Sequence, residues 1–284
     1  MKIDPRIALL VGISAVSTAS ILVRLSISPP LVIAGYRMLF SSMIMGLLGM
    51  NEISDLRRID RKETLLLLIS GVSIGAHFGA WTASLFYTSI AASTVIVDSS
   101  PIFVVLISWI FLREGVNTRE AFGIAISIMG AIIIAIGHAE FKSNLYGDFL
   151  ALLGAIFLAI YLVIGRILRR KMGLASYTFS VYGVAAVVLL LSALVSGNSL
   201  TADLKELIIF ILLALGPSCL GHNSYNYALK YMKASVVSAS ILGEPVGASL
   251  LGAALLGEVP SISTIIGGGI VILGVYLTVF GKNE

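Results

Sequence analysis

Four ionisable residues lie inside long apolar segments of the sequence: Arg37, His77, Asp98 and Glu244. If these segments span a membrane, each charge is costly there, so each of the four residues suggests a functional site. Arg37 could bind a substrate carboxylate, pair with an acidic residue, or bind backbone carbonyl groups. The two carboxylates could bind a cation, an amine or a proton. Together these residues predict a polar binding site within the membrane.

Asp98 and Glu244 each lie shortly before a proline, Pro101 and Pro245 respectively. Proline lacks an amide hydrogen and frees a backbone carbonyl four residues upstream, so it weakens a helix at that point. The sequence therefore predicts a carboxylate beside a weakened helix in two different segments. The alternatives for each carboxylate are an ion pair with Arg37 and a protonated carboxyl group bonded to a neighbouring helix.

Imidazole and aromatic side chains share helix faces in two places. His77 and Trp81 are four residues apart, and His222, Tyr225 and Asn226 lie together later in the chain. Residues three and four apart lie on one side of a helix. Two such faces, turned toward one another, predict a cavity with aromatic walls and a few hydrogen-bonding groups. The alternative is that these five side chains bind neighbouring helices instead.

The elements that would position these residues are membrane-spanning helices. The sequence is 58% hydrophobic and 12% charged, whereas a soluble domain carries about 25% charged residues. Ten segments are long and apolar enough to cross a bilayer, which takes about 20 residues. They lie near residues 7–25, 31–50, 64–88, 93–112, 120–137, 147–167, 175–196, 207–229, 234–257 and 262–280. The predicted fold class is therefore an all-α membrane protein with ten transmembrane helices.

The distribution of basic residues predicts how the chain crosses the membrane. With ten spans both termini face the same side, and fifteen of the 19 lysine and arginine residues fall on that side. Arg24, Lys142 and Lys205 fall on the other side, and Arg37 lies inside a span. Since cytoplasmic loops collect basic residues, both termini are predicted to lie in the cytoplasm and the protein to lie in the cytoplasmic membrane. This explains the net charge of +4 without nucleic-acid binding.

The second part of the chain repeats the first. When the sequence is shifted by 144 residues, residues 78–137 fall on residues 222–281 without a gap. The coinciding pairs are Leu85 and Leu229, Tyr87 and Tyr231, Pro101 and Pro245, Glu114 and Glu258, Gly123 and Gly267, Gly130 and Gly274, and Gly137 and Gly281. Such a register indicates an internal duplication. The predicted repeats are residues 1–140 and residues 141–284.

Five spans in each half have a consequence for the architecture. An odd number makes the second half enter the membrane from the opposite side, so the two five-helix repeats are predicted to be inverted. Inverted repeats are typical of transporters, and the binding site then lies between them. The seven-residue spacing of the glycines predicts close helix packing. Glu114 and Glu258 lie at span ends, so we interpret them as structural and exclude them from the site.

The sequence resembles the EamA-like branch of the drug/metabolite transporter superfamily over nearly its whole length. The residues that carry the resemblance are Gly35-Tyr36-Arg37, Pro101 with Glu114, Glu244-Pro245 with Gly257-Glu258, and the two series of glycines. The resemblance implies two five-span repeats and a central cavity lined by both. It also implies transport of amino acids or other small metabolites, but it is specific for the family and not for the substrate.

These observations predict a secondary transporter that exports a small polar metabolite, with an amino acid as the first candidate, by alternating access. In this hypothesis Asp98 and Glu244 bind the amine or couple protons, and Arg37 balances charge. Trp81 and Tyr225, with the nearby His and Asn residues, shape the pocket. The alternatives are transport of organic cations or drugs such as quaternary amines and, from a different class, an intramembrane enzyme.

The sequence gives no support for other chemistry. It contains no GxxxxGK[ST] nucleotide-binding loop and no HExxH, and its one GxSxG match, Gly71 to Gly75, lies inside the apolar segment 64–88, away from the strand-to-helix turn that a nucleophilic serine needs. The single cysteine, Cys219, excludes an internal disulfide and a cysteine metal cluster, and the three histidines are scattered. We therefore predict no catalytic residue, no metal and no cofactor. The predicted partners are a small-molecule substrate, the lipid bilayer and, as a coupling ion, protons; the expected assembly is a monomer or a homodimer.

Overall fold

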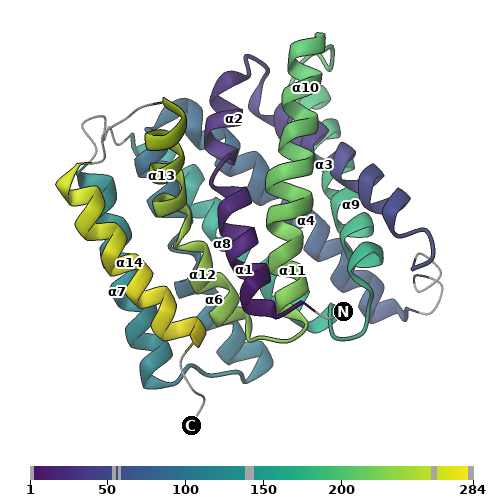
Figure 1. Cartoon of the computed structure of the whole chain (residues 1–284). Coiled ribbons are helices and arrows are strands. Elements are labelled where there is room, and N and C mark those ends of the chain that lie inside the picture. Colours follow the sequence, from purple (N-terminus) through teal and green to yellow (C-terminus); the bar gives the residue numbers. More distant parts are fainter. Residues whose placement is uncertain (1–2, 53–55, 57–58, 138–143, 257–260, 281–284) are drawn as a thin grey trace.

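The computed structural model describes residues 3–52, 56, 59–137, 144–256 and 261–280. Within these ranges the chain is helical, with short connections and no strand. Ten helices, some of them built from several segments, are long and apolar enough to cross a membrane, and they confirm the ten predicted spans. Figure 1 shows them as a bundle, in which the first described helix begins and the last one ends in the lower half of the view.

Six of the ten spans are single helices. They are α3 (Pro30–Leu48), α4 (Arg61–Tyr87), α7 (Thr118–Ile136), α8 (Leu145–Leu168), α9 (Leu174–Val195) and α14 (Ile262–Phe280). The other four are built from consecutive segments. The first span joins α1 (Pro5–Val16) and α2 (Ala19–Leu25), and the ninth joins α12 (Ala234–Ile241) and α13 (Glu244–Leu256). The fourth joins α5 (Ile90–Val97), α6 (Ser100–Ile107) and the π-helix η2 (Ser108–Leu112), and the eighth joins α10 (Leu204–Leu213), the π-helix η3 (Ala214–His222) and α11 (Asn223–Leu229). Interruptions therefore lie inside four of the spans.

Capping boxes fix the start of two helices at the end of the bundle that holds the chain termini. At α4 the Asp60 carboxylate accepts from the Glu63 amide at 2.7 Å, and Glu63 accepts from the Asp60 amide at 3.1 Å. At α7 the same exchange joins Asn117 and Glu120. The first amides of a helix lack internal partners, and these side chains supply them.

The side chains are distributed as in a protein whose solvent is lipid. Large apolar residues such as Trp109, Phe111 and Leu191 are exposed on the outside of the bundle. Arg37, Asp98 and other polar residues are buried inside it. A soluble domain shows the reverse preference, because its charged residues face water. The polar residues that could form a binding site therefore lie in the interior of the bundle.

The inverted repeat is visible in how α7 packs against α14, which lie side by side in Figure 1. Gly123 contacts the backbone at Gly274, and Gly130 contacts the backbone at Gly267. The 144-residue shift carries Gly123 onto Gly267 and Gly130 onto Gly274, so it exchanges the two contacts. This is the pattern that a two-fold axis produces. The helices α3 and α9, which the same shift relates, also pack on one another.

Two spans are interrupted at repeat-equivalent positions. Helix α5 ends at Val97 and α6 begins at Ser100, while α12 ends at Ile241 and α13 begins at Glu244. In both spans the chain resumes its helix with a proline at the first or second position, Pro101 or Pro245. The positions of the prolines predict these breaks. Proline has no amide hydrogen to bond to the carbonyl four residues upstream, and each helix ends at that residue. Discontinuous helices in corresponding positions of two halves are the places where transporters build their sites.

A few features of the sequence fall outside the described residues. They are Gly257, Glu258 and Gly281, the basic residue Lys142, and the predicted boundary between residues 140 and 141. The repeat boundary and the structural interpretation of Glu258 therefore stay predictions.

Candidate functional site

A small cavity lies between the two halves of the bundle, at the two helix breaks. Seven of the eight residues predicted from the sequence line it: Arg37, His77, Trp81, Asp98, His222, Tyr225 and Glu244. Its volume is about 30 Å³, which holds one or two water molecules. Sites for small molecules span roughly 300–1,000 Å³. The structure thus brings these side chains together in a conformation too tight for a metabolite.

Arg37 is the buried cation of this cavity. Helix α3 carries it into the bundle, where its side chain is only 1% exposed. Its Nε donates a hydrogen bond to Ser218 Oγ at 2.8 Å, and its guanidinium carbon lies 3.9 Å from the centre of the Phe78 ring. Within the described chain its Nη1 and Nη2 have no hydrogen-bond partner. The two terminal nitrogens of a guanidinium that lines the cavity therefore have no acceptor among the described residues.

An ion pair was one alternative for Arg37, and the structure does not contain it. The ion pairs of the described residues join Arg166 and Arg170 to Glu114, Lys171 to Glu63, and Lys233 to Glu120. Asp98 and Glu244 line the same cavity as Arg37 but form no ion pair with it. Serine and aromatic contacts hold the guanidinium instead. The alternative of an Arg37–carboxylate ion pair is therefore not the arrangement of this conformation.

The two carboxylates stand at the two helix breaks. Asp98 is the C-terminal cap of α5 and is 1% exposed, and neither of its carboxylate oxygens has a hydrogen-bond partner among the described residues. Glu244 is the first residue of α13, and its backbone carbonyl accepts a hydrogen bond from Ser17 Oγ at 3.2 Å. Ser17 follows the end of α1, so this bond joins the break in the first span to the break in the ninth.

The two imidazoles lie on either side of the repeat axis. His77 Nδ1 donates to the Gly154 carbonyl at 2.9 Å, because a carbonyl can only accept. The His77 ring stacks on Trp81 with centres 6.5 Å apart, and its centre is 6.1 Å from that of His222. The His222 ring meets Phe78 edge-on at 5.0 Å. Since the 144-residue shift carries Phe78 onto His222, this contact lies on the axis itself.

Tyr225 closes the cavity on the side of α1. Its ring centre lies 6.0 Å from that of His222, and its buried hydroxyl has no partner among the described residues. Gly12 of α1 makes room for the ring, because a Cβ at that position would lie 2.6 Å from Tyr225 Cε1. The Nδ1 atom of His222 is also without a partner in the described chain. Both side chains are thus held by packing, with their polar atoms left for another group.

Asn226 does not line the cavity, and for this residue the cavity prediction is wrong. Its Nδ2 donates to the hydroxyl groups of Tyr161 at 2.5 Å and Tyr182 at 3.5 Å. Tyr182 donates in turn to Asn223 Oδ1 at 2.8 Å. Asn226 belongs to a polar cluster that joins α8, α9 and α11. Its side chain therefore bonds to neighbouring helices, which is the alternative stated for it above. Adjacent residues of a helix point about 100° apart, which here turns Asn226 toward α8 and α9 while Tyr225 lines the cavity.

Two residues of the site went unnoticed in the sequence. Phe78 supports the Arg37 guanidinium, and Ser218 accepts its hydrogen bond. A signal for Phe78 exists, because it is the repeat equivalent of His222. Ser218 lies in the π-helix η3 next to Pro217, and π-helical turns are frequent at functional sites. No periodic pattern in an apolar span would have selected that serine.

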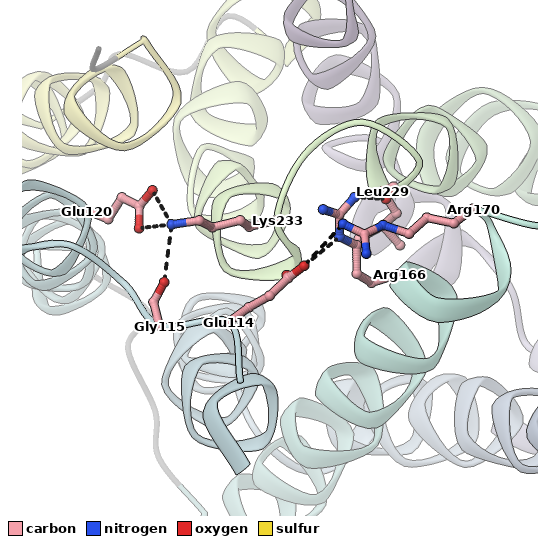
Figure 2. A network of polar contacts seen from close by, with 7 residues as sticks. All are labelled: Glu114, Gly115, Glu120, Arg166, Arg170, Leu229 and Lys233. Atoms are coloured by element: carbon pink, nitrogen blue, oxygen red, sulfur yellow. Dashed lines mark hydrogen bonds and ion pairs between the residues drawn. The ribbon is translucent and has the colours of Figure 1, made fainter. Parts of the chain in front are cut away.

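A network of ion pairs joins the two halves at the end of the bundle that holds the chain termini (Figure 2). Lys233 Nζ lies 3.1 Å from each carboxylate oxygen of Glu120 and 3.1 Å from the Gly115 carbonyl. Arg166 Nε donates to Glu114 at 3.2 Å and its Nη1 donates to the Leu229 carbonyl at 2.8 Å. Arg170 Nη2 also lies 3.4 Å from Glu114, and each of these three ion pairs connects the first repeat to the second.

The Lys233–Glu120 pair does not repeat under the internal symmetry. The repeat shift carries Lys233, Glu120 and Arg166 onto Ser89, Thr264 and Leu22, which are uncharged. At the other end of the bundle, Glu206 accepts hydrogen bonds from Ser26 and Ser28, so different side chains join the two halves at the two ends. The network near the termini supports the structural interpretation of Glu114.

Breaking the Lys233–Glu120 pair is expected to destabilise the protein. Lys233→Met leaves the Glu120 carboxylate, whose side chain is 5% exposed, without its cation. Removing one partner of a buried pair costs several kcal/mol, but Lys233 is one third exposed, so we expect about 1–2 kcal/mol. Thermal unfolding in detergent measures this. The reversed pair Glu120→Lys with Lys233→Glu should recover part of the loss, and a double variant no better than either single one would contradict the pairing.

Comparisons with known proteins point to one family. The EamA-like transporter family matches residues 6–136 and again residues 145–280, one match in each half. An uncharacterized transporter of Archaeoglobus fulgidus is 30% identical over 78% of this chain and 78% of its own length. The uncharacterized inner membrane transporter YedA of Escherichia coli is 30% identical over 89% of this chain and 83% of its own length.

Two further similarities concern the substrate of one relative and the fold. A probable terminal-alkyne amino-acid exporter of Streptantibioticus cattleyicolor is 30% identical over 71% of this chain and 64% of its own length. A protein crystal structure superposes with a TM-score of 0.80 over 97% of both chains at 16% identity, which speaks for the fold alone. With the family matched in both halves, ten spans and a cavity between inverted repeats, this chain is a multi-pass membrane protein that belongs to the EamA-like transporter family.

Proposed function

We propose that this protein exports an amino acid across the cytoplasmic membrane as a secondary transporter. The observation that carries the proposal is the set of unpartnered polar atoms of opposite charge at one cavity. Arg37 offers Nη1 and Nη2, and Asp98 offers both carboxylate oxygens, all without a partner in the described chain. Buried polar atoms normally find partners, so a cluster without them marks a place for a ligand. A zwitterion carries the two complementary charges.

Each group of side chains that lines the cavity has a separate role in this proposal. Arg37 binds the α-carboxylate through its two free nitrogens, a fork that fits a carboxylate. Asp98 and Glu244 bind the ammonium group or exchange protons with it. Trp81 and Tyr225, which the repeat shift relates, surround the side chain of the substrate. The relative named as a probable amino-acid exporter supports this substrate class.

Alternating access is the mechanism that the architecture supports. Two inverted repeats can exchange conformations, so a site between them opens first to one side and then to the other. The cavity is closed to a metabolite here, and the breaks at Asp98 and at Leu242–Gly243 are places where half-helices can move. The ion pairs at one end favour closure of that end. We place this end in the cytoplasm, because the basic residues collect there.

A Glu244→Gln substitution tests the proposal. The amide keeps the shape of the side chain but removes its charge, so we expect amino-acid transport in proteoliposomes to fall at least about tenfold, the size of one charge-assisted hydrogen bond. Thermal stability should stay near that of the parent. The control is Glu63→Gln, because Glu63 pairs with Lys171 away from the cavity. Unchanged transport by the Glu244 variant would remove this residue from the mechanism.

Export of organic cations is the second candidate, favoured by the presence of two carboxylates and two aromatic walls at the cavity. A quaternary amine has no carboxylate, so Arg37 would repel it and not bind it. Competition between an amino acid and tetraethylammonium separates the two candidates. Displacement of a bound amino acid by tetraethylammonium in the parent, unaffected by changing Arg37, would favour the cation.

A further inference from the structure

The charged groups at the cavity do not balance for a neutral amino acid. Helix α3 contributes one guanidinium, Arg37, while the α5–α6 and α12–α13 breaks contribute two carboxylates, Asp98 and Glu244. The other polar lining groups are the imidazoles of His77 and His222, the Tyr225 hydroxyl and the Trp81 indole. Helices α1, α8 and α12 contribute apolar residues such as Val16, Leu158 and Ile241. The cavity therefore has one more acidic group than basic groups.

A zwitterion leaves this excess in place. Its carboxylate matches Arg37 and its single ammonium group matches one of the two carboxylates, which leaves the second carboxylate without a cation. Burying an unpaired charge is costly, so this second carboxylate has to take up a proton or meet another cation. A molecule with one carboxylate and two ammonium groups meets every charge at the cavity.

The positions of the two carboxylates suit two separate cationic groups. Asp98 and Glu244 are not repeat equivalents, because the 144-residue shift carries Asp98 onto Leu242 and Glu244 onto Ser100. They stand on different half-helices from different repeats. Asp98 also caps the C-terminal end of α5, where backbone carbonyls give a partial negative charge that attracts a cation. Its two unpartnered oxygens are buried, with 1% of the residue exposed.

Building on the proposed export of amino acids, we infer that the preferred substrates are diamino acids, with the α-carboxylate on Arg37 and the two ammonium groups on Asp98 and Glu244. The methylene chain between the ammonium groups then lies against Trp81 and Tyr225, which line the same cavity. The two walls come from equivalent positions of the two repeats, so they can flank a linear chain from both sides.

Matched ligand pairs test this inference without any mutation. Lysine and norleucine differ only in the terminal ammonium group. Arginine, which carries a guanidinium in place of the second ammonium group, differs from citrulline in charge at nearly equal size. Binding to the purified full chain is measured by titration calorimetry or by thermal shift, which rises with ligand occupancy. We expect lysine and arginine to bind at least about tenfold more tightly than norleucine and citrulline, the size of one buried charge-assisted contact.

Variants of the two carboxylates give the second measurement. Asp98→Asn and Glu244→Gln should each reduce the preference for lysine over norleucine to less than about threefold, since one ammonium partner is lost. Glu63→Gln should leave the preference as in the parent, because Glu63 lies away from the cavity and pairs with Lys171. A lysine preference that survives both cavity substitutions would overturn the assignment of the second ammonium group.

The outcomes separate this inference from the proposed function. Equal binding of lysine and norleucine, with or without uptake of a proton, overturns the diamino-acid inference and leaves amino-acid export standing. Cadaverine, which is lysine without its carboxylate, binding as tightly as lysine overturns amino-acid recognition through Arg37 itself. Lysine preferred over both norleucine and cadaverine supports the proposed function and the inference together.

Discussion

Replacing Arg37 with methionine is expected to lower the affinity for an amino acid by about 100-fold or more while leaving the folded protein at least as stable as the parent. The carboxylate of the substrate would lose two charge-assisted hydrogen bonds in a buried site, each worth roughly 1.5–3 kcal/mol. In the protein itself the guanidinium makes a single hydrogen bond, to Ser218, and its Nη1 and Nη2 have no partner among the described residues. Binding titration and thermal unfolding together measure the effect.

The two readouts separate a binding role from a structural one. If Arg37 served only to hold helices together, the methionine variant would unfold at a lower temperature and the remaining folded protein would bind as before. That result would remove Arg37 from the proposed site. Arg37→Lys keeps the charge but loses the planar fork, so its affinity should fall between those of the parent and the methionine variant. Ser218→Ala removes the single acceptor of Nε and should cost less, about tenfold.

Placing a methyl group at Gly267 is expected to destabilise the bundle strongly, whereas the same change two residues later is harmless. A Cβ at Gly267 would lie 2.6 Å from the Gly130 carbonyl oxygen and 3.0 Å from the Ile134 amide nitrogen. These are backbone atoms of α7, which cannot move aside as a flexible side chain can. Forcing the two helices apart should cost about 1–3 kcal/mol or more. Thermal unfolding of Gly267→Ala in detergent measures the loss.

Gly269→Ala is the matched control, because it makes the same substitution in the same helix. Gly269 is exposed, and a Cβ there would meet no atom within 4 Å. Alanine favours a helix over glycine by roughly 0.8–1.0 kcal/mol, so this variant should match or exceed the parent in stability. Equal stability of the two variants would show that α7 and α14 do not approach each other as closely as the structure describes.

The glycine contacts between helices follow the repeat symmetry, whereas the charges at the cavity do not. The glycine contacts obey the repeat symmetry, because Gly123 with Gly274 and Gly130 with Gly267 exchange under the 144-residue shift. The charges do not obey it, since Arg37 corresponds to Val181 and Asp98 to Leu242. A symmetric scaffold can exchange two equivalent conformations. An asymmetric cavity can hold a substrate whose two ends differ.

The sequence by itself determined the spans, the repeat and the positions of two of the helix breaks. Ten apolar segments predict ten helices, because only helices and closed barrels satisfy the backbone in a bilayer, and continuous apolar segments of about 20 residues fit helices. The breaks after Val97 and Ile241 follow from Pro101 and Pro245, since the missing amide acts on the carbonyl four residues upstream. Hydropathy and the effect of proline depend only on residues within one segment, so the sequence of that segment is enough to predict them.

The tertiary structure alone decided which way each helix is turned and which partners meet. Tyr225 and Asn226 are neighbours in the sequence, yet one lines the cavity and the other bonds to Tyr161. In a span that is apolar all round, the sequence fixes the helical period but not its rotation, which packing against the other helices sets. The Arg37–Phe78 contact and the Lys233–Glu120 pair join residues 41 and 113 positions apart. Such pairs depend on how the two repeats pack, so no stretch of the sequence contains them.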